Sequence, residues 1–221
     1  MNIPRRETME GNDPLLIRRG REGELIPNEN LMAPVEFLTN RRILQITNVI
    51  GFSFETEGGR GLVDIISEAL LCLDAISNDP IKLIISCSGG SVYGTFALYD
   101  AIKSTDSPVW TFGRACMSGG ALLLAAGEKG HRYVYPNTFS MLHLIQIYSR
   151  SGVTDSKTDA IRSAEFTRNK DRMIELLMEC GVNKTPEKIN EDIDRELWMD
   201  AKETVAYGLA DHVIRGGILL E

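Results

Sequence analysis

Apolar residues follow two different periodicities along most of the chain. Helical spacing of apolar residues predicts helices over residues 61–77, 92–104 and 158–180. Short runs rich in apolar residues predict strands at 41–49, 81–86 and 108–112, and the run at 81–86 is nearly all apolar, as expected where both faces of a sheet are covered. Strand–turn–helix units repeated with short glycine-rich turns indicate an α/β domain around a largely parallel core sheet.

The second half of the chain continues this alternation with clear start and stop signals. A turn is expected over GRACMSGG, then a short helix over 119–127 ended by Gly127, then two strands in RYVY and FSMLHLI. Gly181 is expected to end the long helix. The cap and N1 proline of Thr185-Pro186 predict another helix, and the capping-box spacing of Asp200 and Glu203 predicts the last one.

The first 34 residues lack this pattern. They are polar, contain proline and carry arginines set among acids, a composition typical of a flexible arm. A gating or docking segment that orders on assembly is the alternative. We therefore expect an arm over residues 1–34 and one domain over residues 35–221, a length that buries a core without disulfides or metals.

Composition narrows the class of protein. A formal net charge of −7 argues against a general nucleic-acid binder, and no apolar run is long enough to cross a membrane. The N-terminus lacks the apolar core of a secretion signal. The chain has four cysteines without a CxxC pair and only three histidines, which disfavours a cysteine-rich zinc site. We expect a cytoplasmic protein whose cysteines stay reduced and mostly pack in the interior.

Two turns place glycines between an apolar strand and a helix, Ser88-Gly89-Gly90-Ser91 and Ser118-Gly119-Gly120. If both lie at the carboxyl ends of neighbouring strands, two backbone amides can point at one position, which is what an oxyanion hole requires. Ser118 would then lie beside that position. A purely structural role of either turn, or a phosphate cradle at the first, is the alternative.

A serine nucleophile needs a base, and the chain has three histidines. His131 lies in a polar turn and is expected to be solvated, whereas His212 lies near the C-terminal end. His143 lies in an apolar strand that can reach the Ser118 turn, although a histidine in such a strand is also typical of a hydrogen-bonded core residue. An acceptor must orient the base, and composition alone does not choose among the many carboxylates.

The ordered series of these motifs resembles one known family. From Ile84 to Val213 the chain is similar to the proteolytic subunit of the Clp protease, in IISCSGGSV, in AAGEKG after the Ser118 turn, in Pro136-Asn137 with Met141-Leu142-His143, and in AYGLAD near the end. The resemblance implies a ClpP/crotonase-like α/β fold of repeated β-β-α units, with the long helix as a protruding handle.

The resemblance also implies roles for individual residues. Ser118 matches the nucleophile and His143 the general base, while Gly90 and Gly119, with Gly89 beside them, match the oxyanion and substrate-binding turns. The third member of the catalytic triad is usually Asp in the family, and Glu196 matches that position in this chain. Its neighbours Asp194 and Asp200 are alternatives, although Asp200 is better explained as a helix cap.

Two departures from the family pattern accompany the change of the third residue. Ser88 stands where the family has a proline, and His143 is followed by Leu-Ile-Gln-Ile-Tyr instead of Gln-Pro and a glycine-rich strand. Substrate preference and ring pairing are therefore open.

The implied activity is that of a serine endopeptidase without cofactor or metal. The resemblance implies that it works inside a homo-oligomer of stacked heptameric rings and receives unfolded polypeptide from a separate AAA+ unfoldase. This sequence carries no GxxxxGK[ST] motif, so we expect it not to hydrolyse ATP itself. The alternatives are a non-catalytic structural ring subunit, a phage-type maturation protease or signal-peptide peptidase relative, and an acyl-CoA hydratase or isomerase on the same fold.

Overall fold

The structure is a computed structural model that describes residues 18–19, 25–26, 34–55, 60–145 and 155–214. The chain divides into two compact units, residues 1–41 and 42–221. In the first unit, β1 (Arg18–Arg19) pairs antiparallel with β2 (Leu25–Ile26), and α1 spans Pro34–Thr39. Most of residues 1–34 lie outside the described ranges, so the flexible arm stays a prediction.

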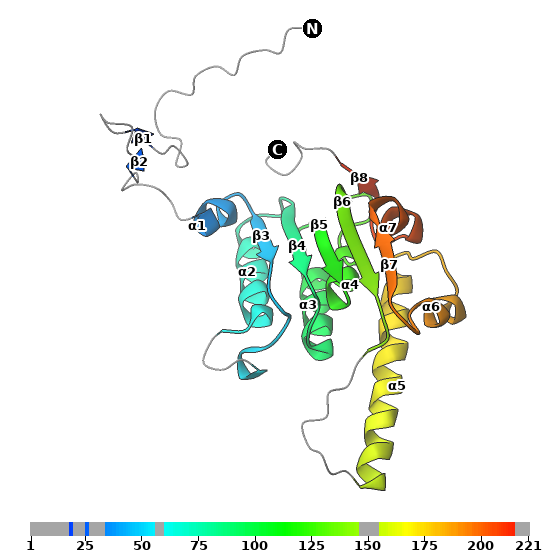
Figure 1. Cartoon of the computed structure of the whole chain (residues 1–221). Coiled ribbons are helices and arrows are strands. Elements are labelled where there is room, and N and C mark those ends of the chain that lie inside the picture. The colour runs from blue at the N-terminus through cyan, green and yellow to red at the C-terminus, as the bar shows by residue number, and fades with distance from the viewer. Residues whose placement is uncertain (1–17, 20–24, 27–33, 56–59, 146–154, 215–221) are drawn as a thin grey trace. The chain divides into compact units, whose positions relative to one another are not determined.

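The described part of the second unit is built on a six-stranded sheet in the order β3-β4-β5-β6-β7, with β8 also paired to β6 (Figure 1). Its strands are β3 (Ile43–Ile46), β4 (Ile81–Cys87), β5 (Val109–Met117), β6 (Arg132–Leu142), β7 (Leu197–Asp200) and β8 (His212–Val213). The pairs from β3 to β6 are parallel, and only β7 runs antiparallel to its neighbour. The prediction of a largely parallel core sheet is confirmed.

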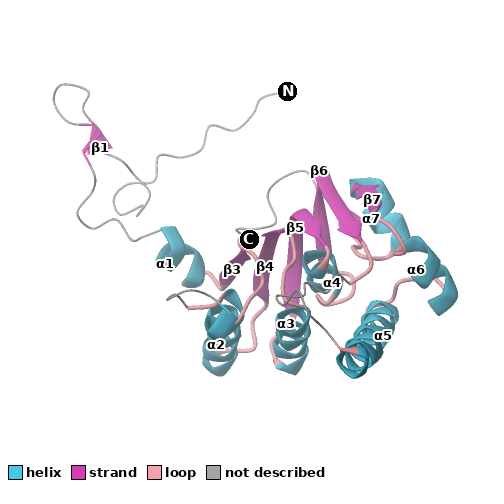
Figure 2. Cartoon of the chain, turned by 60° about the horizontal axis from the view of Figure 1, so that its bottom comes forward, coloured by secondary structure: helices cyan, strands magenta, loops and turns pink. Residues whose placement is uncertain are grey.

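The helices of this unit follow the predicted apolar periodicity. They are α2 (Leu62–Ile76), α3 (Val92–Ser104), α4 (Gly119–Ala125), α5 (Ser156–Glu179), α6 (Pro186–Asp192) and α7 (Ala201–Tyr207), with a 3-10 turn η1 at Ser53–Glu55. Figure 2 shows α2, α3 and α4 along one face of the sheet. The caps at Thr185 and Asp200 form as predicted, and Gly181 follows α5 with a φ of 87°.

Two predictions about β5 and β6 are wrong. Residues 113–117 of the predicted turn GRACMSGG are the end of β5, and the two predicted strands RYVY and FSMLHLI belong to one strand, β6. The residues between the two predicted strands, Pro136 to Thr138, form an irregularity like a β-bulge in β6. The register with β5 shifts there, from Gly113 opposite Val134 to Ala115 opposite Phe139. Thr138 Oγ1 accepts from the Tyr135 amide at 2.9 Å and donates to the Gly113 carbonyl at 2.8 Å, which replaces backbone pairing that the excursion interrupts.

Smaller differences concern element ends. The short helix after Ser118 ends at Ala125 and not at Gly127, and β7 forms in a segment where the periodicity predicts no strand. A strand of four residues, with alternating partly exposed positions, is stabilised by pairing with β6 more than by its own pattern.

Helix α5 extends beyond the sheet at its N-terminal end, as Figure 1 shows. Its buried residues, Ile174, Leu176 and Leu177, all lie in the last two turns, whereas Ile161 is 70% exposed in the single chain. The apolar residues of this helix therefore divide into two groups. Ile174 and Leu177 belong to the core, and Ile161 and Ala164 are exposed.

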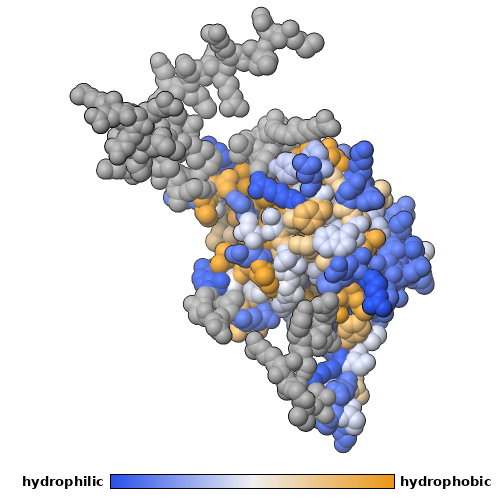
Figure 3. All heavy atoms as spheres, viewed as in Figure 1, coloured by the Kyte–Doolittle hydropathy of each residue, from blue (hydrophilic) through white to orange (hydrophobic). Residues whose placement is uncertain are grey.

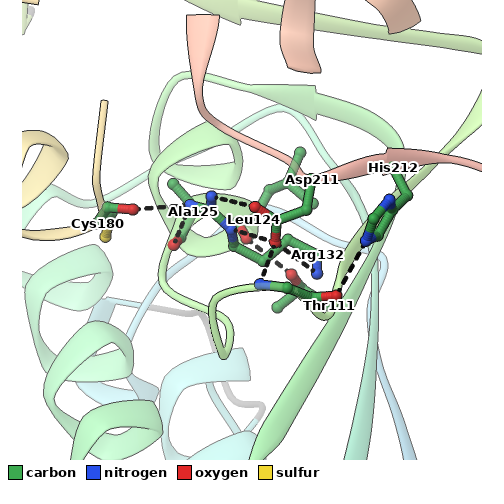
Figure 4. Close-up of polar contacts among 8 residues, drawn as sticks. Thr111, Leu124, Ala125, Arg132, Cys180, Asp211 and His212 are labelled. Atoms are coloured by element: carbon green, nitrogen blue, oxygen red, sulfur yellow. Dashed lines mark hydrogen bonds and ion pairs between the residues drawn. The ribbon is translucent and has the colours of Figure 1, made fainter. Parts of the chain in front are cut away.

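A buried arginine joins four elements of the second unit. Arg132, which is 1% exposed, donates to the carbonyls of Ala125 at 3.2 Å and Cys180 at 2.8 Å, the residues at the ends of α4 and α5. It also pairs with both carboxylate oxygens of Asp211, at 2.9 and 2.6 Å (Figure 4). The amides of Gly130 and Arg132 donate to the same carboxylate, so Asp211 is fully satisfied.

Candidate active site

Ser118 lies where β5 turns directly into α4. Its backbone has a φ of 53° and a ψ of −123°, a left-handed conformation that is uncommon for a residue with a Cβ atom. The turn is secured because the Ser118 amide donates to the Met141 carbonyl of β6 at 2.7 Å, and the Ser118 carbonyl accepts from the Ala121 amide at 3.0 Å. Strained residues of this kind cluster at functional sites, where the surrounding structure holds them.

The glycine turn after β4 passes directly against Ser118. A Cβ atom on Gly89, whose φ is 95°, would lie 2.7 Å from Ser118 Cβ and 3.0 Å from its Oγ. A Cβ atom on Gly119 would lie 2.3 Å from Thr95 Oγ1 on α3. Only glycine therefore fits at either position. The approach of Gly89 to Ser118 shows that the two turns singled out from the sequence are in direct contact.

Two backbone amides near Ser118 remain available. The Gly89 carbonyl accepts from Ile50 at 2.9 Å and the Ser91 amide donates to Ile50 at 2.8 Å, which fixes the turn on both sides of Gly90. Among the hydrogen bonds of the described residues, the amides of Gly90 and Gly119 are not donors. This arrangement can stabilise negative charge that develops on a carbonyl oxygen.

Ser118, His143 and three of the four glycines of the two turns line one cavity of about 230 Å³. Its remaining walls include six apolar residues that come from five segments of the chain, Val49, Val92, Phe96, Leu122, Ile145 and Met173. The sequence pattern did not identify these walls, because each is an ordinary apolar residue of its own segment. Five of the six residues proposed from the sequence thus meet at a mostly apolar cavity.

His143 follows β6 directly and is partly buried. No hydrogen bond among the described residues joins it to Ser118 or to a carboxylate. The other two histidines lie elsewhere: His131 stacks on Trp110 with ring centroids 4.4 Å apart, and His212 contacts the Gly130 carbonyl at 3.2 Å. The expectation that His131 is solvated is wrong, because this stacking leaves it half-buried.

The register of β7 favours Glu196 over its neighbours as the partner of His143. Leu142 pairs with Leu197 and Met141 with Trp198, so His143 and Glu196 are the next residues beyond the last pair of the ladder. Directly opposite residues of antiparallel strands point to the same face of the sheet. Both residues also line a second cavity of about 320 Å³, together with Asp194.

The two alternative carboxylates are placed differently. Asp200 lies opposite Phe139, and its Oδ1 accepts from the amides of Lys202 and Glu203 at 2.8 Å in a complete capping box. Asp194 lies 3.8 Å from Arg195 Nε. Asp200 is therefore committed to the start of α7, as the sequence indicated.

The cysteines close to the two turns are not placed to act as nucleophiles. Cys87 and Cys116 are buried, and burial raises the pKa of both thiols above the ordinary value. A thiol that stays protonated is a poor nucleophile. In the described ranges all four cysteines are free, and only Cys72 is exposed.

Metal-binding clusters and membrane-spanning helices are both absent from the described residues. No group of three or more histidine, cysteine, aspartate or glutamate side chains is placed to hold a metal ion there. No helix in the same residues is long and apolar enough to cross a membrane.

Comparisons with known proteins agree on one family. A family model described as Clp protease matches residues 31–217. ATP-dependent Clp protease proteolytic subunit 1 of Rhodopirellula baltica is 39% identical over 140 residues, which span 62% of this chain and 59% of that protein. Subunit 2 of Pseudomonas aeruginosa is 34% identical over 149 residues, or 66% of this chain and 72% of that protein.

A solved structure is similar over most of its length. A point mutant of ClpP1 from Listeria monocytogenes matches with a TM-score of 0.72 and 28% sequence identity, covering 85% of this chain and 99% of that one. This likeness confirms the fold class that the motif series implies.

Proposed function

The chain belongs to the Clp protease family, and from this premise we propose that it is a serine endopeptidase with Ser118 as the nucleophile and His143 as the general base. The observation that carries the proposal is the shared cavity. A strained serine, a histidine and two available glycine amides reach it from three separate segments of the chain.

The chemistry follows from these positions. Ser118 Oγ attacks the scissile carbonyl while His143 takes its proton, and the amides of Gly90 and Gly119 stabilise the oxyanion. His143 then protonates the leaving amine, and a water molecule hydrolyses the acyl-enzyme by the same route in reverse. Glu196 orients the imidazole from the neighbouring strand. The reaction needs no cofactor or metal.

The cavity supports a preference for an apolar side chain beside the cleaved bond. Phe96, Leu122 and Met173 line it next to Ser118, and burying apolar surface there stabilises the bound substrate. Unfolded polypeptide exposes such side chains along its length, which suits it as a substrate.

We infer a ring assembly for the complete enzyme, with stacked heptamers of this chain and a separate AAA+ unfoldase. The relatives are named as proteolytic subunits of an ATP-dependent protease, and this sequence carries no GxxxxGK[ST] motif. Exposed apolar residues on α2 support contacts between copies, because Leu71 is 62% and Ile76 is 76% exposed. Figure 3 shows hydrophobic residues exposed between hydrophilic ones on the face in view.

A second candidate is a structural ring subunit without catalysis. The absence of a hydrogen bond from His143 to Ser118 or to a carboxylate, among the described residues, favours it. Catalytic hydrogen bonds are often long before substrate binds, so the first candidate is better supported.

Labelling with a fluorophosphonate probe separates the two. For the peptidase we expect covalent modification of Ser118, located by mass spectrometry, in a native assembly that also hydrolyses unfolded polypeptide. An assembly of the correct native mass in which Ser118 stays unmodified would identify the structural subunit instead. Ser104 on the end of α3 provides an exposed serine that should remain unlabelled.

Replacing the two carboxylates separately should divide catalysis from stability. Glu196→Ala is expected to lower kcat by as much as ~10⁴-fold with little change in unfolding free energy, because the imidazole loses its orienting partner. Asp200→Ala should instead lower the unfolding free energy by about 1 kcal/mol and keep turnover, because α7 loses its cap. Peptide hydrolysis measures kcat and urea unfolding measures stability for both variants. Loss of turnover in Asp200→Ala, with turnover kept in Glu196→Ala, would assign the catalytic role to Asp200.

A further inference from the structure

The proposed third residue, Glu196, is held by a side chain outside the triad. Trp198 Nε1 donates to Glu196 Oε2 at 2.9 Å. Glu196 directly precedes β7 and lies two positions before Trp198, so both side chains lie on the face that carries His143. Within the described residues no other hydrogen bond to Glu196 is present.

Trp198 is itself fixed on that face. It pairs opposite Met141 of β6, and its ring lies 5.9 Å from the ring of Phe139 in a tilted arrangement. Cross-strand aromatic pairs of this kind stabilise a sheet and limit side-chain movement. The indole therefore offers its N–H from a fixed place, although half of the residue is exposed.

The bond leaves the second carboxylate oxygen of Glu196 available. A glutamate has three rotatable side-chain bonds, so fixing its side chain in one conformation costs considerable conformational entropy. An indole is a donor only, so it fixes one oxygen without competing for the imidazole N–H and without neutralising the carboxylate charge. Arg195, the cation next to Glu196 in the sequence, contacts Asp194 instead.

We propose that Trp198 is a positioning residue that anchors Glu196 Oε2 and thereby presents Oε1 to His143. This role rests on the proposed function, because it requires Glu196 to orient the general base. It extends that function with a side chain that no motif of the sequence identifies.

The first experiment removes the indole N–H and keeps an aromatic ring. In Trp198→Phe we expect kcat for peptide hydrolysis to fall by roughly 10-fold or more, with KM nearly unchanged, because the misplaced carboxylate affects the chemical step and not substrate binding. The matched control is Trp110→Phe, which changes the chain's other tryptophan, one that stacks on His131. It should keep both kinetic constants.

Two double variants test the mechanism of the effect. In a Glu196→Ala background, Trp198→Phe should cause no further loss, because the group it anchors is gone. In a Glu196→Asp background it should cause a much smaller loss than in the wild type, because aspartate has one rotatable bond fewer to fix. Additive losses in both backgrounds would overturn the proposal, since they would indicate a general effect on folding or packing.

A measurement that does not depend on activity covers the case in which Trp198→Phe fails to fold. Protein labelled with 5-fluorotryptophan has two fluorine signals, from Trp110 and Trp198. Glu196→Ala should shift the Trp198 signal and leave the Trp110 signal in place. An unmoved Trp198 signal would show that the anchoring bond does not form, and would overturn the proposal.

The outcomes also separate this role from the proposed function. Hydrolysis that survives Ser118→Ala would remove the proposed function and this role together. Hydrolysis that is lost in Ser118→Ala but unchanged or raised in Trp198→Phe would overturn the role of Trp198 alone.

Discussion

Replacing Ser118 with alanine is expected to lower peptide hydrolysis by at least ~10⁴-fold, because the reaction loses the only group that forms the acyl-enzyme. Folding should be retained. Ser118 Oγ makes no hydrogen bond among the described residues, and alanine keeps the same Cβ atom in the left-handed turn. We therefore expect the unfolding free energy to stay within about 1 kcal/mol of the wild type.

Hydrolysis of a fluorogenic peptide, with urea unfolding of the same preparations, measures both effects. Ser104→Ala is the matched control, because it removes an exposed hydroxyl at the end of α3, away from the cavity. Turnover by Ser118→Ala close to that of the control would exclude a serine nucleophile at this position.

Replacing Arg132 with methionine is expected to destabilise the fold by about 3–5 kcal/mol, which is typical of breaking a buried ion pair from one side. The side chain of Arg132 is 2% exposed and that of Asp211 is 14% exposed. The variant leaves the Asp211 carboxylate without its cation and the Cys180 and Ala125 carbonyls without a donor. Since Ala125 ends the helix that begins after Ser118, we expect turnover to fall as well.

Urea unfolding of three variants tests the cause. Arg132→Met/Asp211→Asn should recover part of the loss, because the uncompensated charge is gone. Arg132→Lys should recover little, since an ammonium cannot reproduce the forked contacts of the guanidinium. A loss below about 1 kcal/mol in Arg132→Met would contradict the importance of the pair.

The same pair predicts a dependence of stability on pH. Burial alone would raise the pKa of Asp211, but the hydrogen bonds and charge of Arg132 outweigh burial and lower that pKa below its ordinary value. A lowered folded-state pKa contributes stability that is present above the unfolded value of about 3.9 and is lost as pH falls through the folded pKa. The stability difference between wild type and Arg132→Met/Asp211→Asn should therefore shrink below about pH 4.

Most helices of the fold were predictable from the sequence, because their signals are local. The bounds of α3 match the predicted helix, and the caps at Thr185 and Asp200 form as their spacing indicates. Periodicity, capping and glycine stops involve residues within one or two turns of each other. The two glycine turns were also recognisable from local sequence, whereas the contact of Gly89 with Ser118 is a feature of the tertiary structure.

The strands were harder to predict, because their length depends on a neighbour. β5 and β6 continue through polar residues that interrupt the apolar pattern, since Thr138 bonds to Gly113 on the adjacent strand. β7 forms because β6 offers it an edge.

By itself, the sequence determined the α/β class, the helices and the candidates Ser118 and His143, because those depend on residue type, local spacing and a recognisable series of motifs. Only the tertiary structure decided which side chains share a cavity: Ser118, His143 and three glycines line one, and His143 lines another with Glu196 and Asp194. The pairing of β6 with β7 brings the segment before Leu197 to the end of β6, where His143 follows. The two strands lie far apart in the chain, so local spacing does not say which residues meet, and a shift of one residue would turn every side chain to the other face.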